Sequence, residues 1–239
     1  MGSNGRTNYD AFQVEAQRKV GSLTFDAHYT WAHAMSNFLN LEDPYAPLFW
    51  NQDDVTPRHR FVMQLGYQLP FGRGSSGALN RVVGGWTIYY VGFLVSGQYF
   101  TPGFSGSDPS NTQTFGGLPD RIANGNLPAS QRKLDHWFDP SAFAVPPDRR
   151  FGNSGVNILE GPGYNAHHVS LNKDAKLTER FTLQFSWHIS NIFNHPNFLN
   201  PDGNISSPGT VGQIFSDVTH WDLQKGGARA MEGKLRLIF

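Results

Sequence analysis

Long segments in which apolar and polar residues alternate one for one are the feature that most limits how this chain can fold. From Leu23 to Trp31 every odd-numbered residue is apolar or aromatic and every even-numbered residue is polar. Successive side chains of a strand point to opposite faces, so this pattern predicts a strand with one apolar and one polar face. The same period recurs in Tyr9–Lys19, Arg58–Pro70, Ala166–Lys176, Phe181–Ser190 and Arg229–Phe239.

One further strand, Gly85–Gln98, differs from the others because both of its faces are apolar. A strand of this kind is normally buried on both sides, so we expect both faces to be covered. With it, the sequence predicts seven long strands.

The connections between these strands fall into two classes. They are short after the first, third and fifth strands, and long after the second, fourth and sixth, where loops are expected at 35–57, 99–165 and 194–227. A short strand at Val211–Phe215 is expected inside the last loop. Short turns on one side and long extracellular loops on the other are typical of an up-and-down barrel in the outer membrane. Strands of about 10–13 residues are also long enough to cross a bilayer.

Composition narrows the function further. The 19 basic and 19 acidic residues give a net charge of zero, which argues against nucleic-acid binding. Cysteine is absent, so disulfides, zinc–thiolate sites and a cysteine nucleophile are excluded. No apolar run is long enough for a transmembrane helix, and the first residues lack the apolar core of a signal peptide.

A soluble β-sandwich or lipocalin-like barrel is the alternative reading of the same alternation. It would act as a binding module, with the loops 35–57 and 99–165 forming its site. It predicts that Phe12, Phe25, Phe61 and Phe185 are buried against a second sheet, whereas the membrane barrel predicts that they face outward.

Several groups of residues have expected roles in a membrane barrel. The chain ends on Phe239, with Leu237 and Leu235 on the same face, which resembles the signal that such barrels present to their assembly machinery. Aromatic residues near strand ends are expected at the membrane interfaces: Tyr29, Trp31, Tyr67, Trp86 and Trp187. Aromatic residues in the loops are candidates for contacts with a ligand: Tyr45, Trp50, Phe100 and Trp137.

An ordered series of short segments resembles the C-terminal barrel of Oar-like TonB-dependent receptors, which carry a carboxypeptidase-regulatory-like N-terminal domain. The matching segments are Tyr9–Val14, Ala27–His33, Arg58–Val62, Leu69–Gly74, Gly84–Trp86, Ser96–Pro102, Trp137–Phe143, Phe151–Asn153, Asn157–Gly163 and Asn191–Phe198. The resemblance implies uptake of a large or scarce solute across the bacterial outer membrane. It also implies contact with outer-membrane lipid and with a TonB complex, the latter only through N-terminal parts that this sequence lacks.

The resemblance bears on the domain organisation as well. Receptor barrels of this kind have about 22 strands, and seven cannot close antiparallel all round. We therefore predict an all-β, antiparallel transmembrane β-barrel of which residues 9–239 are a C-terminal part. Residues 1–8 are expected to be a disordered tail or the edge of a fragment. A structural or adhesive surface protein is the alternative function within the same fold.

No cofactor, metal or catalytic site is expected. The adjacent His167 and His168 would point to opposite faces of a strand and could not chelate one ion together. Asp26, His28 and Ser170 or Ser186 would form a hydrolytic triad only if brought together, and no nucleophile motif surrounds either serine.

Overall fold

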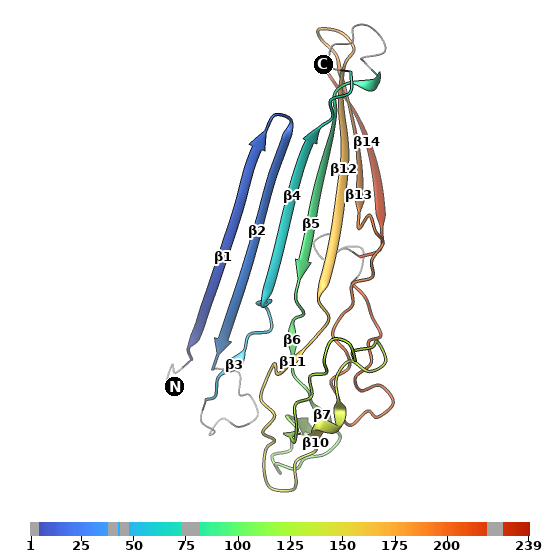
Figure 1. The fold of residues 1–239 in the computed structure, drawn as a ribbon. Helices are drawn as coiled ribbons and strands as arrows, with labels where there is room; N and C mark the ends of the chain where they lie inside the picture. The colour runs from blue at the N-terminus through green and yellow to red at the C-terminus, as the bar shows by residue number, and fades with distance from the viewer. Residues whose placement is uncertain (1–4, 38–42, 44–47, 73–81, 219–226) are drawn as a thin grey trace.

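A computed structural model of the chain describes residues 5–37, 43, 48–72, 82–218 and 227–239. Seven long strands form one antiparallel sheet in which each strand pairs with its neighbours in chain order (Figure 1). They are β1 (Thr7–Val20), β2 (Leu23–Ser36), β4 (His59–Gln68), β5 (Trp86–Val95), β12 (Tyr164–Lys176), β13 (Thr182–Ser190) and β14 (Ala230–Ile238). The short β3 (Asn51–Gln52) extends the sheet beside the end of β2. The predicted all-β, antiparallel fold is confirmed.

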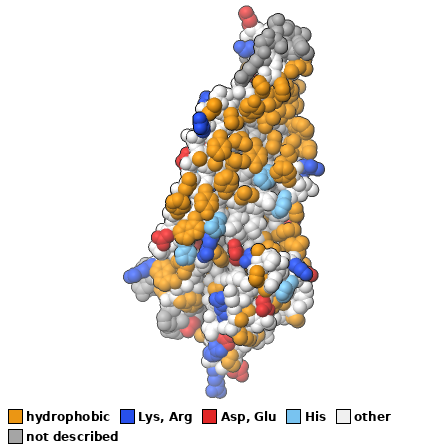
Figure 2. Space-filling view, in the orientation of Figure 1, with side chains coloured by type: hydrophobic (Ala, Val, Ile, Leu, Met, Phe, Trp, Pro, Cys, Tyr) orange, Lys and Arg blue, Asp and Glu red, His pale blue; other side chains and the backbone are white. Residues whose placement is uncertain are grey.

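The register of the sheet places most apolar positions on one face; β5 is the main exception, because it carries apolar residues on both faces. Val14, Tyr29, Phe61 and Leu94 lie opposite one another in a single row across β1, β2, β4 and β5. Figure 2 shows the resulting band of hydrophobic side chains over the strands. The band follows directly from the period of two, because antiparallel partners share a face of the sheet.

No second sheet packs against this band in the part of the chain that the structure describes. Phe12 is 60% exposed, and Phe25, Phe61 and Phe185 are only partly buried. A soluble sandwich would bury all four rings, because each exposed ring forfeits the hydrophobic free energy of its area. The soluble β-sandwich alternative is therefore wrong.

The sheet is open within the described residues. Strand β1 pairs only with β2, strand β14 pairs only with β13, and every residue of both edge strands is exposed. Both edge strands run in the same direction, from the loop end of the sheet to the end that carries the short turns (Figure 1). Direct pairing between them would be parallel, which differs from every long pair in the sheet.

Some strand boundaries and one expected strand differ from the sequence prediction. Thr7 and Asn8, assigned to the N-terminal tail, are the first residues of β1. Strand β2 continues to Ser36 because Ala34 and His33 still have partners in β1. The expected strand at 211–215 is instead a turn followed by irregular chain, since Val211 bonds locally to Ser207.

The prediction that β5 is covered on both sides is also wrong for the described chain. Tyr89 on the polar face of the sheet is 50% exposed, and Leu94 on the apolar face is 46% exposed. One face of β5 belongs to the apolar band, and the other lines a hollow of the polar face.

The connections 96–163 and 191–218 fold together into a compact unit at one end of the sheet, here called the loop body. It contains β6 (Tyr99–Phe100), β7 (Phe104–Ser105), β8 (Gly116–Gly117), β9 (Asp120–Arg121), the 3₁₀ turn Pro140–Ala142, β10 (Phe143–Ala144) and β11 (Leu159–Glu160). Its core is a cluster of buried residues: Phe100, Phe138, Ala142, Phe143 and Leu159. Backbone hydrogen bonds from Gly103 to Gly203 and from Ile205 to Gly103 join the two connections.

No helix among the described residues is long and apolar enough to span a membrane.

Gly97 connects β5 to the loop body at a point where two backbones touch. A Cβ at this position would lie 1.8 Å from the carbonyl oxygen of Gly161, and that segment is held in place by the bond from Gly161 N to Gln98 O. We expect Gly97→Ala to lower the free energy of unfolding by roughly 1–3 kcal/mol through overpacking. Gly209→Ala, where a Cβ meets nothing within 4 Å, is the matched control. Urea denaturation of both variants in detergent tests this, and equal midpoints would contradict it.

Candidate functional site

The polar face of the sheet, here called the polar wall, is the candidate functional surface. It consists of the residues that alternate along each strand with those of the apolar band and point to the opposite face. They include Thr24, Asp26, His28, Gln64, Gln68, Thr87, His168, Ser170, Asn172, Ser186, His188, Glu232 and Lys234. In a membrane barrel the face opposite the lipid surrounds the lumen. Solutes that enter such a barrel would contact these side chains first.

A hollow of about 620 Å³ lies on the polar wall across β5, β12, β13 and β14. An apolar strip from β5, Tyr89, Val91 and Phe93, lines one side of it. His168 and His188 line the other side, together with the hydroxyls of Ser170 and Ser190 and the charged Glu232 and Lys234. This mixture of a few polar groups beside aromatic surface is common in small-molecule sites.

Hydrogen bonds order the polar side of the hollow. Ser170 Oγ and His188 Nδ1 are 2.9 Å apart, and Asn172 Nδ2 donates to Ser170 Oγ at 2.9 Å. Asp26 and His28 of β2 are separated from Ser170 of β12 by two intervening strands, β4 and β5. The hydrolytic triad considered from sequence is therefore not assembled around Ser170, and Ser186 lies one strand further away.

A second hollow of about 460 Å³ lies on the polar wall over β1, β2, β4 and β5. Its polar lining consists of amides, hydroxyls, one carboxylate and the Lys19 ammonium group, and includes Gln17, Thr24, Asp26, Gln64 and Gln68. Tyr89 and Val91 line both hollows, and the ring of Tyr89 lies over Gly66, where a Cβ would be 3.2 Å from the ring edge. The wall therefore offers a hydrogen-bonding region beside an aromatic one.

The two histidines at 167 and 168 point to opposite faces, as predicted. His167 Nδ1 lies 2.6 Å from the Tyr90 hydroxyl on the apolar face, where Tyr90 pairs with Val169. His168 contacts Phe93 edge-on at the hollow of the polar wall.

The five aromatic residues expected at the membrane interfaces all lie on the apolar face. Trp31 and Tyr29 lie toward the loop end of β2, and Tyr29 is hydrogen-bonded to His59 at 2.9 Å. Tyr67 and Trp86 lie at the turn end, and Trp187 lies inside β13. Their role as membrane anchors stays a prediction.

Lys173 is a residue of the apolar face that the sequence reading missed. Its Nζ donates to the carbonyl oxygens of Val82, at 2.8 Å, and Gly84, and lies 4.9 Å from the centre of the Trp86 ring. These contacts hold the segment before β5 against β12 and give the ammonium group hydrogen-bond partners within its apolar surroundings. The sequence did indicate an unusual residue here, because Lys173 occupies a position that alternation with Val169 and Leu171 assigns to the apolar face.

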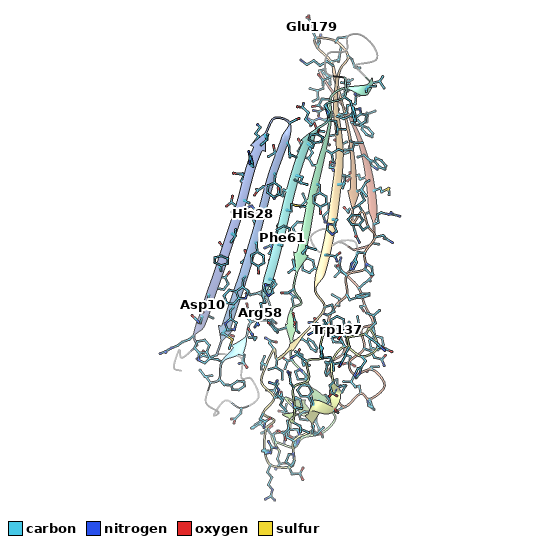
Figure 3. All side chains as sticks on the ribbon, in the orientation of Figure 1. Asp10, His28, Arg58, Phe61, Trp137 and Glu179 are labelled. Atoms are coloured by element: carbon cyan, nitrogen blue, oxygen red, sulfur yellow. The ribbon has the colours of Figure 1, made fainter. Side chains whose placement is uncertain are left out.

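The loop aromatics have different environments. Tyr45 lies outside the described residues, and Trp50 is 48% exposed. Phe100 is 9% exposed within the core of the loop body, where its ring packs edge-on against Phe138, and its role as a ligand contact stays a prediction. Trp137, labelled in Figure 3, donates from Nε1 to Glu160 O at 2.9 Å and keeps a partly exposed ring beside Arg132.

Burial also affects a titratable group in the loop body. It raises the pKa of Tyr99, while the neighbouring Arg58 guanidinium, 5.7 Å from the ring centre, acts in the opposite direction. Tyr99 is therefore a neutral hydroxyl at physiological pH, so this part of the loop body keeps a polar contact to Arg58 without an added negative charge.

The C-terminal residues expected to form an assembly signal share the apolar face. Leu235 pairs with Phe185 and Leu237 with Leu183, and Phe239 follows directly after β14 with 84% of its surface exposed. Recognition of these residues by an assembly machinery stays a prediction.

Comparisons with known proteins agree with the architecture. A search of curated proteins and a search of solved structures each give no match. A family model described as an outer membrane beta barrel domain matches residues 1–224, nearly the whole chain. This match, the large antiparallel sheet and its exposed apolar band place the protein in the bacterial outer membrane. The chain belongs to the outer membrane beta barrel domain family.

Proposed function

We propose that this chain is the C-terminal barrel part of an Oar-like TonB-dependent receptor that takes up a large or scarce solute. The observation that carries the proposal is that the described part of the chain forms an open sheet of seven long strands whose two edge strands run in the same direction. An antiparallel barrel that includes this sheet needs an odd number of further strands between β14 and β1, and a large receptor barrel can supply them.

The polar wall supports a role in solute passage. Its two hollows offer amide, hydroxyl and imidazole groups beside an aromatic strip, which suits weak contacts with a passing solute. In this role the wall binds and guides a solute and performs no covalent step. Energy would arrive from a TonB complex through parts of the receptor outside this sequence.

A structural or adhesive function is the second candidate, and exposed apolar residues of the loop body favour it. Phe115, Ile122 and Phe215 are each at least 65% exposed on this outward-facing unit. Exposed aromatic side chains are common contact points with protein partners. In this reading the wall anchors the loop body in the membrane.

The size and partners of the native protein distinguish these functions. An antibody against the loop body should detect a polypeptide much larger than 26.6 kDa in outer membranes of the native host. In-cell crosslinking should join that polypeptide to TonB, and its upstream sequence should encode a plug. An outer-membrane product of about the size of this chain, with no crosslink to TonB, would contradict uptake and favour the adhesive function.

A further inference from the structure

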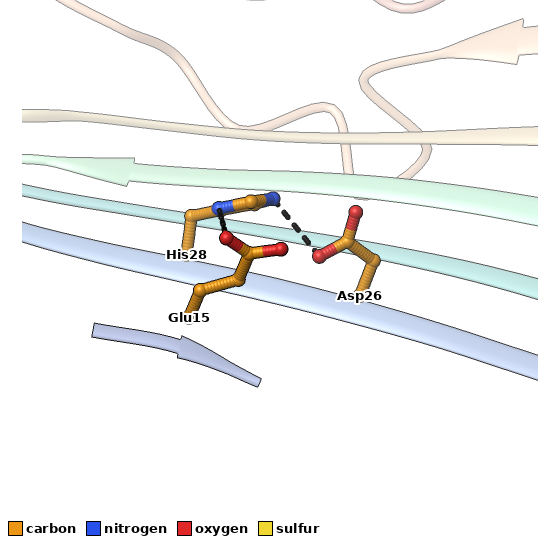
Figure 4. Close-up of side chains that lie close together, drawn as sticks. All are labelled: Glu15, Asp26 and His28. Atoms are coloured by element: carbon orange, nitrogen blue, oxygen red, sulfur yellow. Dashed lines mark ion pairs between the residues drawn. The ribbon is translucent and has the colours of Figure 1, made fainter. Parts of the chain in front are cut away.

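Three potential metal ligands meet on the polar wall between β1 and β2. Asp26 and His28 are two residues apart on β2 and so share a face, and Glu15 of β1 lies directly opposite His28 in the register (Figure 4). The tight turn at Gly21 and Ser22 determines this register, with Val20 opposite Leu23 and Gly21 at a φ of +58°. The cluster is therefore a product of the hairpin itself.

The three residues lie close enough to share a single small cation. His28 Nε2 lies 2.9 Å from Asp26 Oδ1, whereas the contact of Glu15 Oε2 with His28, at 4.0 Å, is to the other ring nitrogen, Nδ1. One ligand atom from each residue can be chosen so that all three lie within 4.8 Å of one another. Bonds of about 2.1 Å to a tetrahedral zinc ion place neighbouring ligand atoms about 3.4 Å apart. A shift of about half an ångström between the imidazole and Asp26 would therefore bring these two ligands to that separation.

Asp26 also has an oxygen atom without a hydrogen-bond donor. Oδ1 is inaccessible to water and accepts no hydrogen bond from any described residue, although His28 Nε2 is 2.9 Å away. The ring N–H is therefore not aligned with this oxygen. An unsatisfied buried carboxylate oxygen costs free energy, and a cation placed between it and the imidazole would remove that cost.

We propose that Glu15, Asp26 and His28 form a binding site for a divalent transition-metal ion such as Zn²⁺ or Co²⁺ on the lumenal wall. One imidazole and two carboxylates form a nitrogen–oxygen ligand set that suits these ions, and the two negative charges balance the charge of the cation. Calcium is disfavoured because it needs six to eight oxygen ligands.

The site has room for an exchanging ion. The side chains of Glu15 and His28 are 59% and 43% exposed, so Glu15 can swing its carboxylate toward the Nε2 side, and water can complete the coordination shell. An open position of this kind would also let a metal-bearing solute share the ion with the wall. The inference rests on the geometry of the polar wall and does not require that the protein transports a solute.

Isothermal titration of the tag-free full chain, folded in detergent micelles, with ZnCl₂ tests the site. We expect one Zn²⁺ per chain, and Glu15→Gln, Asp26→Asn and His28→Gln should each weaken binding by roughly tenfold or more. These near-isosteric changes preserve side-chain size, and circular dichroism verifies that each variant keeps its β-structure. Visible absorption of bound Co²⁺ should change in His28→Gln, because its nitrogen ligand is lost.

His33→Gln is the matched control variant. His33 lies on the same strand and opposite a carboxylate residue, Asp10, but on the other face of the sheet and outside the three-ligand cluster. Its loss should leave Zn²⁺ binding unchanged. Failure to bind Zn²⁺ at millimolar concentration, equal affinity in His28→Gln and the original protein, or tighter binding of Ca²⁺ than of Zn²⁺ would each overturn the proposal.

Discussion

Met63→Arg is expected to prevent stable insertion of the sheet into the membrane. Met63 is in the middle of β4 on the apolar face, between Ala27 of β2 and Gly92 of β5. An arginine at the lipid-facing midplane of an outer-membrane barrel costs about 2–4 kcal/mol, because the guanidinium group loses its hydration. The measurement is the fraction of protein that resists urea extraction from outer membranes, followed by urea titration in liposomes.

Gln64→Arg is the matched control for this substitution. Gln64 is the next residue of the same strand, is exposed, and lines the polar hollow over β1, β2, β4 and β5. The same charge should cost little there, because water reaches the side chain. If Met63→Arg and Gln64→Arg were extracted equally, the assignment of the two faces to lipid and lumen would be wrong.

Phe138→Ala should unfold the loop body and leave the sheet intact. Phe138 is 1% exposed, and its ring packs edge-on against both Phe100 and Phe143, with ring centres 5.8 and 6.2 Å apart. Deleting a buried phenylalanine ring costs about 3–5 kcal/mol. This small core has few other large side chains, so we expect local rather than global unfolding.

Protease treatment of intact cells tests the loop-body prediction. Cleavage within 96–163 should become much faster in Phe138→Ala, while the membrane-embedded strands stay protected. Phe115→Ala removes a ring that is 71% exposed and should behave like the original protein. Equal cleavage of all three proteins would show that the aromatic cluster does not stabilise the loop body.

The wall of the barrel was predictable to within a few residues, and the register of its first hairpin was within reach. Alternation identified six of the seven long strands, and a run that is apolar on both faces identified the seventh. The tight turn at Gly21 and Ser22 implies that Glu15 faces His28. The sequence reading considered Asp26 and His28 with distant serines and so missed the carboxylate across the hairpin. Lys173 was also missed, although alternation assigns this charged residue to the apolar face of its strand.

The loop body shows where local patterns stop being informative. Residues 99–165 have no sustained period, and the sequence suggested Phe100 as a contact with a ligand. Its burial depends on Phe138 and Leu159, which lie dozens of positions further along the chain. Two-residue strands such as β6 and β11 form because the segments are brought together, and they carry no periodic signal of their own.

The sequence by itself determined the strands, the apolar and polar faces and the separation of short turns from long loops. These features arise from interactions between residues close together in the chain, since side-chain direction in a strand alternates with every residue. Only the tertiary structure decided which loop aromatics are buried, which carbonyls accept from Lys173, and how the polar wall forms its hollows. Those outcomes depend on packing between segments far apart in sequence. The hydrophobic free energy of burial there comes from contacts between residues whose positions in the chain follow no common pattern.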